Sequence, residues 1–540
     1  MKKTTPLLFL ILLALGFYLG VRFTYSDTEK RFDTVSKENN KLSQILGIID
    51  SQYVEEVDMD SIIEKCIPKI IEELDPHSTY IPADEVEAMT SDLQSSFSGI
   101  GIRFTIQDDT VNISDVIRGG PSEDAGVLAG DKIITVNDTL FVGKKICTNE
   151  NAMKKLKGPK GSFVTLGLQR FGEKKPVKVR IRRDDILVES IEASYLINDR
   201  WGYIQIQRFA ENTFIEFIEA LVTLAEENLE GLIIDLRGNG GGYMAVAIEM
   251  ANQFLARNDM IVYTEGANCE TMTEKANGRG FFKDMPLVVL VDETSASASE
   301  IIAGTIQDND RGIVIGRRTF GKGLVQQQLP LNDGSMMRLT IARYHTPSGR
   351  CIQKPYTNGD SESYAMDLID RYNRGEFFSQ DSIHQNEELI YTTKNGRTVF
   401  GGGGIMPDIF VSSDTTDVTP YTRELATKGI IAQFTLKYSN ANRHRLSHHK
   451  RFETLVADLK GRNLLDQLVE FAQERGVEPN HGQIASSRRL LENSLYSNII
   501  YQILGMQEHI KYINLDDPTV LKALEVLESG KAFPETKNHK

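Results

Sequence analysis

The stretch PLVVLVDETSASASEIIAGTIQDNDRGIVIG, residues 286–316, carries the clearest structural signal in the chain. The apolar run at 287–291 predicts a buried strand, and the helical spacing of apolar residues from Ser299 onward predicts a helix. GIVIG, residues 312–316, predicts a second, shorter strand. Strand, helix and strand in this order is typical of a sheet covered by helices, so we expect an α/β core.

The same alternation extends over about residues 190–352. Strands are predicted at WGYIQI (201–206) and EGLIIDLR (230–237), and helices at 212–229 and 243–256. LVQQQLPLNDGSMMRLTIARY, residues 324–344, has the pattern of a hairpin with NDG in its turn. These elements extend the predicted core on both sides of the opening stretch.

Other regions surround or interrupt this core, which we assign to 186–413. Residues 27–96 have apolar residues at helical spacing and are expected to be helical. Residues 97–185 alternate short strands with glycine turns, which predicts a compact β-rich module. The polar segment 354–396 is expected to be an insertion or a mobile loop, and 414–540 a helical domain that binds a partner or braces the fold.

The N-terminus has the pattern of a targeting segment. Lys2 and Lys3 precede an unbroken apolar run at 7–21. Positive charge followed by such a run is typical of a signal peptide or a signal anchor. Because no small-x-small cleavage site follows, an uncleaved anchor within 1–26 is favoured over a cleaved signal, with the bulk of the chain outside the cytoplasm.

The composition disfavours several classes of function. The 540 residues carry a formal net charge of −14, so nucleic acid is not an expected partner. The four cysteines include no C-x-x-C pair, which argues against a zinc site and against a disulfide framework. Neither a metal nor a cofactor is expected.

The stretch GRRTFGKG, residues 316–323, matches all but the last position of a phosphate-binding P-loop. The pattern G-x-x-x-x-G-K-[ST] ends here on Gly323, so the hydroxyl that would bind Mg²⁺ is missing. A P-loop also lies between a strand and a helix, whereas the residues after Lys322 have the pattern of a strand. A nucleotide-binding function is therefore disfavoured.

Three serines at 295–299 lie where the predicted strand meets the predicted helix. Such a corner exposes a nucleophilic serine in some hydrolases, but serine is also a common helix cap, so the triplet alone leaves both interpretations open. A nucleophilic serine needs a base. His345 is one candidate, although no acid stands out as its orienting partner. Lys322 is the other, because burial among glycines and apolar residues would lower its pKa.

Residues 295–326, SASASEIIAGTIQDNDRGIVIGRRTFGKGLVQ, resemble the core signature of the carboxy-terminal processing proteases, also called tail-specific proteases. Further motifs agree in the family's order: LDPHSTYIP (74–82), FSGIGIRF (97–104), LIIDLRGNGGG (232–242), YHTPSGRCIQ (344–353) and GGGIMPDIFV (402–411). The resemblance covers about residues 40–413. It implies a Ser-Lys endopeptidase with an α/β (α+β) core of the ClpP/crotonase-like type, acting through an acyl-enzyme.

The resemblance also implies roles for individual residues. Ser297 would be the nucleophile, Lys322 the general base, and Gln326 the residue that positions the lysine. In a regular strand the Cα atoms of Lys322 and Gln326 would lie about 13 Å apart, too far for a hydrogen bond. The chain must therefore bend, and Gly321 and Gly323 make that possible.

The tetrahedral intermediate of such an enzyme needs two backbone N–H donors for its oxyanion. The family pattern implies Ala298 for one donor and Gly242 for the other, with Gly241 as the alternative. The glycine run could also be a plain loop between a strand and a helix. Asp235 and Arg237 are expected to hold the end of the strand rather than take part in chemistry.

The β-rich module at 97–185 resembles a PDZ domain. SGIGI, residues 98–102, matches the loop whose backbone N–H groups capture a peptide's C-terminal carboxylate, after which the peptide adds to the sheet edge as a strand. Helix 149–156 is expected to line the side-chain pocket. The tail-binding residues implied are Gly99, Ile100, Gly101 and Ile102.

The expected partners follow from these assignments. Substrates would be proteins with apolar C-termini, and the membrane would be contacted through the N-terminal segment. In a Gram-negative source the catalytic part would face the periplasm from the inner membrane. The insertion and the helical tail exceed the minimal family pattern and are expected to restrict access, bind an adaptor or set the oligomeric state. A non-catalytic, tail-binding scaffold is the alternative function.

Overall fold

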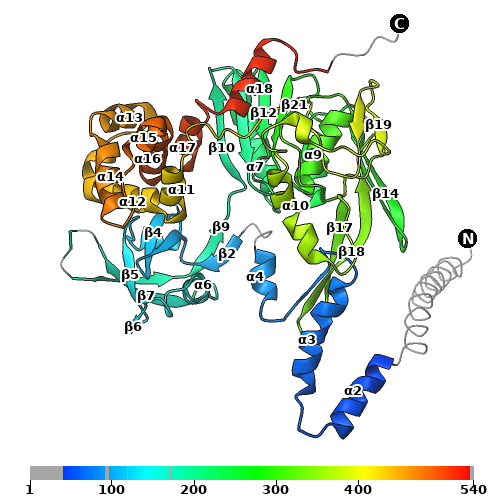
Figure 1. The fold of residues 1–540 in the computed structure, drawn as a ribbon, viewed down its shortest axis with the longest axis horizontal. Helices are drawn as coiled ribbons and strands as arrows, with labels where there is room; N and C mark the ends of the chain where they lie inside the picture. Colours follow the sequence, from blue (N-terminus) through cyan, green and yellow to red (C-terminus); the bar gives the residue numbers. More distant parts are fainter. Residues whose placement is uncertain (1–40, 92–95, 118, 171, 174, 535–540) are drawn as a thin grey trace, which may run out of the picture. The chain divides into compact units, whose positions relative to one another are not determined.

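The structure, a computed structural model, describes residues 41–91, 96–117, 119–170, 172–173 and 175–534 (Figure 1). The chain divides into two compact units, Met1–Leu74 and Asp75–Lys540. No helix among the described residues is long and apolar enough to cross a membrane. The anchor expected within 1–26 lies outside the described residues.

The first unit contains two described helices, α2 (Lys41–Gln52) and α3 (Met59–Glu72). The Asp58 carboxylate caps α3 by accepting the backbone N–H of Ser61 at 3.2 Å. Helices were expected throughout 27–96, and this is correct for α2, α3 and the short α4 (Val86–Ser91) of the second unit. It is wrong at β1 (Thr79–Ile81), which pairs with a strand far along the chain.

The core of the second unit is a six-stranded sheet with the order β10-β11-β12-β15-β16-β21. The strands from β11 to β21 run parallel, and β10 is antiparallel to β11. This confirms the α/β expectation. The strand bounds are β10 (Ile191–Ile197), β11 (Trp201–Ile206), β12 (Gly231–Asp235), β15 (Leu287–Val291), β16 (Ile313–Gly316) and β21 (Ile409–Phe410).

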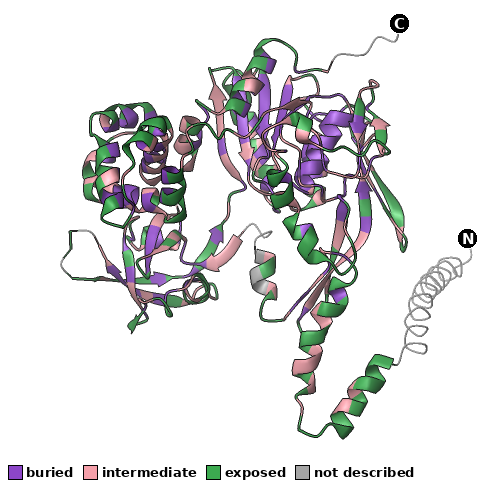
Figure 2. Cartoon of the chain, viewed as in Figure 1, coloured by how far each residue is buried: buried purple, intermediate pink, exposed green. Residues whose placement is uncertain are grey.

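Both faces of this sheet are covered, so its strands are apolar almost throughout (Figure 2). Leu232 and Ile234 face a core shared with helices α7 (Thr213–Glu226), α8 (Met244–Ala251) and α9 (Ala298–Asp308). Ile233, on the opposite face, packs in a second core with residues of α18 (Pro518–Glu528). The last helix of the chain therefore completes the core instead of belonging to a separate helical domain.

A second sheet has the order β1-β18-β13-β14, with β17 also paired to β18. The hairpin of β17 (Leu324–Pro330) and β18 (Met336–His345) confirms the one predicted around NDG. The hairpin of β13 (Met260–Gly266) and β14 (Cys269–Lys275) was not predicted. Most residues of β14 are exposed, so it lacks the apolar alternation that reveals a strand.

The β-rich module forms a sheet of order β3-β4-β5-β7-β8, with β6 paired to β5, and a separate pair of β2 and β9. Helix α6 (Asn149–Leu156) contributes Ala152 and Leu156 to the core of this sheet. The bounds are β2 (Ser96–Gly99), β3 (Ile102–Gln107), β4 (Thr110–Val116), α5 (Pro121–Asp124), β5 (Lys132–Val136), β6 (Thr139–Leu140), β7 (Phe163–Gln169), β8 (Val177–Arg182) and β9 (Asp184–Leu187).

The insertion at 354–396 is structured, so its interpretation as a mobile loop is wrong. It contains helix α10 (Ser361–Asn373), the 3₁₀ turn Gln380–Ser382 and β19 (Ile390–Thr392), which pairs with β20 (Thr398–Phe400). Tyr364 and Arg371 of α10 are buried. The sequence did not indicate this packing, because both buried residues carry polar groups and the segment lacks an apolar pattern.

The C-terminal region is helical, as expected. Helices α11 to α16 share one apolar core, and the Asp517 carboxylate caps α18 through the N–H groups of Thr519 and Val520. The remaining bounds are α11 (Pro420–Thr427), α12 (Ile430–Leu446), α13 (Phe452–Lys460), α14 (Leu464–Gln473), α15 (His481–Ser486), α16 (Arg488–Leu504) and α17 (Met506–Ile513).

Candidate active site

Ser297 occupies a strained turn between β15 and α9. Asp292 fixes the start of this turn, since its carboxylate accepts the backbone N–H of Thr294 at 3.0 Å and of Ser295 at 3.1 Å. Ser297 has φ 55° and ψ −113°. A non-glycine residue in such a conformation costs about 1–3 kcal/mol and persists only where its surroundings hold it. The residue remains partly exposed.

The carboxylate of Glu300 is the group that holds this turn. Its Oε2 accepts the backbone N–H groups of Ser297 and Lys322, each at 2.9 Å. Its Oε1 accepts the N–H of Gly321 at 2.8 Å and the hydroxyl of Thr319 at 2.5 Å. Burial raises the pKa of Glu300, and the hydrogen bonds oppose that rise. One buried carboxylate thus joins the serine turn to the lysine segment.

Tyr344 of β18 makes a second bridge between the same two segments. Its hydroxyl lies 3.2 Å from the carbonyl oxygen of Ser297 and 2.9 Å from that of Lys322 and donates to both. The tyrosine is 1% exposed, so water does not compete for these bonds. Glu300 and Tyr344 together fix the backbones of Ser297 and Lys322 relative to each other.

The ammonium group of Lys322 lies in a setting that disfavours its charge. Burial lowers the pKa of Lys322, and repulsion from Arg338 lowers it further, whereas Glu300 and Asp75 oppose the shift. Both acids lie far from Lys322 in the sequence. Lys322 Nζ donates to Gln326 Oε1 at 3.0 Å.

The chain bends between Lys322 and Gln326, as the distance argument requires. Gly321 has φ +89°, and the pairing of β17 with β18 shifts register between Val325 and Gln326. Gly323 serves a different purpose, because a Cβ there would lie 2.8 Å from the backbone nitrogen of Gln353. Gly321 turns the chain before Lys322 and Gly323 permits a close approach, so the bend expected between Lys322 and Gln326 falls at the register shift instead of at these glycines.

The glycine run after β12 lies against the serine turn. A Cβ on Gly241 would lie 2.7 Å from the Cβ of Ser297, so only glycine fits there. The Gly241 N–H donates to Asn239 Oδ1 at 2.8 Å and is not free. Within the described part of the chain, no acceptor contacts the N–H groups of Gly242 and Ala298. Of the two glycines considered, Gly242 has the available donor.

The P-loop interpretation fails because the backbone N–H groups that would bind a phosphate already have acceptors. The N–H groups of Gly321 and Lys322 are bound to Glu300, and that of Gly323 donates to Gln353 Oε1 at 2.8 Å. A phosphate would find these donors occupied, and β17 follows where a P-loop needs a helix.

Three family models match the chain. Residues 200–363 match peptidase family S41, residues 98–181 match the PDZ domain, and residues 421–505 match a family of unknown function. A carboxy-terminal-processing protease of Bartonella bacilliformis is 34% identical over 330 residues, which cover 59% of this chain and 75% of the relative. The chain belongs to the carboxy-terminal processing protease family. This is a family of serine peptidases.

Two further similarities were found. The carboxy-terminal processing protease CtpB of Bacillus subtilis is 35% identical over 327 residues, which cover 59% of this chain but only 66% of that relative. The solved photosystem II D1 C-terminal processing protease is 28% identical, with a TM-score of 0.34, over 56% of this chain and 82% of its own. At that TM-score, family membership rests on the sequence relatives.

In the described part of the PDZ domain, one edge of the sheet has no paired strand and two backbone N–H groups near it have no acceptor. Strand β3 is the terminal strand of its sheet, with Ile102 turned towards the core. Ile100 and Gly101 precede it, and no acceptor among the described residues contacts their backbone N–H groups. A Cβ on Gly99 would lie 3.7 Å from the Cα of Lys157, the residue at the end of α6, so the predicted loop lies beside the end of that helix.

His345, the other base considered, does not approach the serine in the manner of a base. It stacks on Tyr263 with ring centroids 4.7 Å apart, and its Nδ1 lies 3.1 Å from the carbonyl oxygen of Gly349. Adjacent strand residues face opposite sides, so Tyr344, which contacts Ser297, directs His345 away from it. Among the described residues His345 makes no hydrogen bond to Ser297, so the geometry favours Lys322 over His345 as the base.

Sequence reasoning missed the groups that organise this site. Glu300 was detectable, since Ser297-x-x-Glu300 matches the S-x-x-E pattern of a helix capping box. Tyr344 had no comparable signal. Asp235 and Arg237 behave as expected, because they form an ion pair at 2.6 Å at the end of β12.

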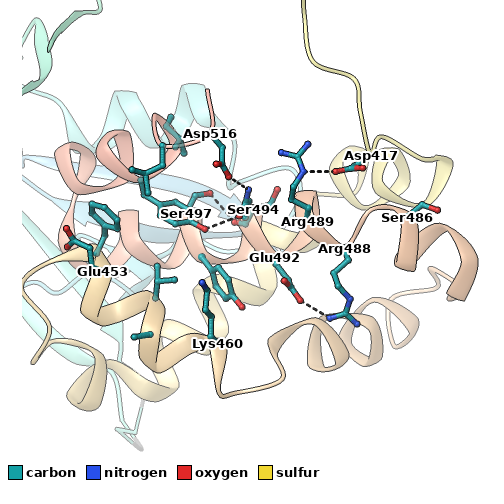
Figure 3. A pocket seen from close by; sticks show the side chains of 18 of the residues that line it. Asp417, Glu453, Lys460, Ser486, Arg488, Arg489, Glu492, Ser494, Ser497 and Asp516 are labelled. Atoms are coloured by element: carbon teal, nitrogen blue, oxygen red, sulfur yellow. Dashed lines mark hydrogen bonds and ion pairs between the residues drawn. The ribbon is translucent and has the colours of Figure 1, made fainter. Parts of the chain in front are cut away.

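A cavity of about 1070 Å³ lies among the C-terminal helices, and its lining includes neither Ser297 nor Lys322 (Figure 3). Its arginines are already paired, Arg489 with Asp417 at 2.9 Å and Arg488 with Glu492 at 2.8 Å. It has no arrangement of nucleophile and base, so we assign it no part in the chemistry.

Proposed function

We propose that this chain is a serine endopeptidase in which Ser297 and Lys322 form the catalytic dyad and the PDZ domain recognises protein C-terminal tails. The observation that supports this most directly is the double bridge by Glu300 and Tyr344, which fixes the backbones of Ser297 and Lys322 together. The lowered pKa of Lys322 adds support, because only a neutral lysine accepts a proton.

In the proposed mechanism, neutral Lys322 takes the proton of the Ser297 hydroxyl as Oγ attacks the carbonyl carbon of the scissile peptide. The negative charge that develops on the carbonyl oxygen is stabilised by the N–H groups of Ala298 and Gly242. The lysine then gives its proton to the leaving amine, and an acyl-enzyme remains on Ser297. Water, deprotonated by the same lysine, attacks that ester, and the lysine then gives the proton to Ser297 Oγ as the acyl product leaves.

Gln326 positions the lysine in this scheme. Its Oε1 accepts from Lys322 Nζ at 3.0 Å, while its Nε2 donates to the carbonyl oxygen of His77 at 2.6 Å. The second bond fixes which end of the amide faces the lysine. The ammonium formed during the reaction therefore has an acceptor already in place.

The PDZ domain would hold the tail of the substrate. The N–H groups of Ile100 and Gly101 would bind its terminal carboxylate, with Gly99 and Ile102 shaping the loop, and the tail would add to the edge of β3. We further propose a core of the ClpP/crotonase-like type and attachment to the inner membrane through the N-terminal segment. A non-catalytic scaffold remains the second candidate, although no observation favours it.

The test uses the full chain and an unfolded protein substrate with an apolar C-terminal tail. We expect Ser297→Ala and Lys322→Ala each to abolish cleavage. Ser299→Ala is the matched control, because Ser299 lies in the same serine triplet but donates to the carbonyl oxygen of Asn239 at 2.9 Å. It should cleave within about tenfold of the wild type. Unchanged proteolysis in both dyad variants would refute the assignment, and tail binding without cleavage by the wild type would support the scaffold.

A further inference from the structure

Helix α10 of the insertion directs one tyrosine towards the segment that carries Lys322. Tyr364 is 7% exposed. Its hydroxyl lies 2.8 Å from Nε2 of His77 and 3.2 Å from Nε2 of Gln353. Neither neighbour belongs to α10, so the hydroxyl joins the insertion to two other segments of the protein.

Both neighbours lead back to the lysine. Gln353 Oε1 accepts the N–H of Gly323, the residue after Lys322, at 2.8 Å. On the other side, the carbonyl oxygen of His77 accepts from Gln326, whose Oε1 accepts from Lys322 Nζ. The contacts therefore close a ring, which we call the lysine ring, formed by Lys322, Gly323, Gln353, Tyr364, His77 and Gln326.

The direction of each hydrogen bond in the lysine ring can be assigned. Gln353 uses its oxygen for Gly323, so its Nε2 faces Tyr364 and donates to the hydroxyl. The hydroxyl proton is then directed at His77 Nε2, which must be unprotonated to accept it. Burial lowers the pKa of His77 to about 4, with Lys322 and Lys354 adding to the shift and Asp75 opposing it. His77 is thus a neutral acceptor at ordinary pH.

The insertion also fixes the tyrosine and the chain before the lysine. Lys354 Nζ lies 4.0 Å from the ring centroid of Tyr364 and 4.1 Å from that of Phe320, and it pairs with Asp367 at 2.8 Å. Buried Arg371 donates to the carbonyl oxygens of Arg318 and Thr319 at 2.6 and 3.0 Å.

We propose that Tyr364 is a positioning residue for the reaction, which keeps Lys322 and Gln326 in register through His77 and Gln353. The insertion is then part of the support of the active site rather than a peripheral addition. This inference rests on the proposed function, since it assumes that Lys322 is the base. If the insertion were only a brace, losing the hydroxyl would change stability without changing how the lysine titrates.

The experiment compares the full-length wild type with Tyr364→Phe on the tail-bearing substrate, from about pH 6 to pH 10. Tyr364→Phe should lower kcat about three- to tenfold with KM within about twofold, because the two hydrogen bonds of the hydroxyl, with His77 and with Gln353, are lost while the substrate site is untouched. The acidic limb of the kcat/KM profile should also move to higher pH. A loosened ring admits water, which weakens the effect of burial and raises the pKa of Lys322 towards its free value, while Arg338 still lowers that pKa and Glu300 and Asp75 still raise it.

Tyr372→Phe is the matched control. Tyr372 lies on the same helix, is half exposed, and within the described part of the structure its hydroxyl has no hydrogen-bond partner. It should keep the wild-type kcat, KM and pH profile. A Tyr364→Phe enzyme with wild-type kcat and profile would overturn the proposal, as would a raised KM with kcat unchanged.

A double-mutant cycle with His77→Ala tests the connection itself. Both changes break the hydrogen bond between His77 and Tyr364, so Tyr364→Phe should lower kcat by a smaller factor in the His77→Ala background, where only its bond with Gln353 is left to lose. Effects that multiply would contradict the ring. Because Lys322→Ala is measured in parallel, activity retained in that variant would refute the proposed function, whereas its loss combined with a silent Tyr364→Phe would refute this inference alone.

Discussion

At the scale of residues, the candidate site is held together by buried acceptors and donors that take no part in the proposed chemistry. Glu300 accepts four hydrogen bonds, from Ser297, Thr319, Gly321 and Lys322. It therefore stabilises a serine conformation that costs free energy on its own. Strain at the serine and support from the glutamate are two parts of one arrangement.

Glu300→Gln should damage both fold and activity. An amide has only one acceptor oxygen, so its NH₂ group would face donors that now bond to the second carboxylate oxygen. Those donors would be left without an acceptor. We expect the free energy of unfolding to fall by about 2–4 kcal/mol and kcat to fall by more than about tenfold. Glu265→Gln, at a 56% exposed side chain, is the control and should change neither quantity in denaturation and activity assays.

Gly241→Ala should abolish activity for steric reasons. The new Cβ would lie 2.7 Å from both the Cβ of Ser297 and the carbonyl oxygen of Ala296, at a φ of +101°. Gly240→Ala is the matched control, since a Cβ there meets nothing within 4 Å. The measurement is the rate of cleavage by the two variants. Equal activity would show that the glycine run does not contact the serine turn.

At the scale of elements, the core was predictable because its strands and helices carry clear periodicity. β15, α9 and β16 occur where the stretch 286–316 predicts them. Hairpin β13–β14 was not predictable, because an exposed strand has no apolar pattern. The lysine ring was also out of reach, since Gln326 bonds to a carbonyl 249 residues earlier in the chain. Local sequence records periodicity and turn chemistry, but it does not record which distant backbone groups meet.

The PDZ domain should bind tails through the loop before β3. We expect Gly101→Ala to weaken binding of an apolar peptide with a free C-terminus, because Gly101 has φ +74° and the added Cβ would lie 3.0 Å from Ile186. Gly126→Ala has the same backbone strain, at φ +75°, with open space around it, and should bind as the wild type does. Fluorescence anisotropy measures both, and equal affinities would contradict tail capture by this loop.

At the scale of the whole molecule, helix α18 is part of the protease core, although it lies far along the chain. Residues of α18 pack on the face of the central sheet opposite α9, and Arg237 pairs with Asp517 at 2.8 Å where α18 begins. The helical region was predicted, but not that α11 to α16 form one core while α18 packs on the central sheet. Helical periodicity does not indicate which element a helix packs against.

Val520→Ala should therefore destabilise the core, although it lies near the end of the chain. Val520 is fully buried, and removing its methyl groups should lower the free energy of unfolding by about 2 kcal/mol. Leu521→Ala, at a residue 47% exposed on the same helix, should cost less than about 0.5 kcal/mol. Equal effects in chemical denaturation would contradict the packing of α18 on the sheet.

The central claim is that Lys322 acts as a neutral base, and the pH dependence of kcat/KM tests it most directly. Burial lowers the pKa of Lys322, and only the deprotonated lysine accepts the serine proton, so activity should rise as pH passes through that lowered pKa. The account predicts a rise complete well below about 10.4, the pKa of a free lysine. A rate that still climbs at about pH 10 would contradict it, because the lysine would then titrate as if it were in water.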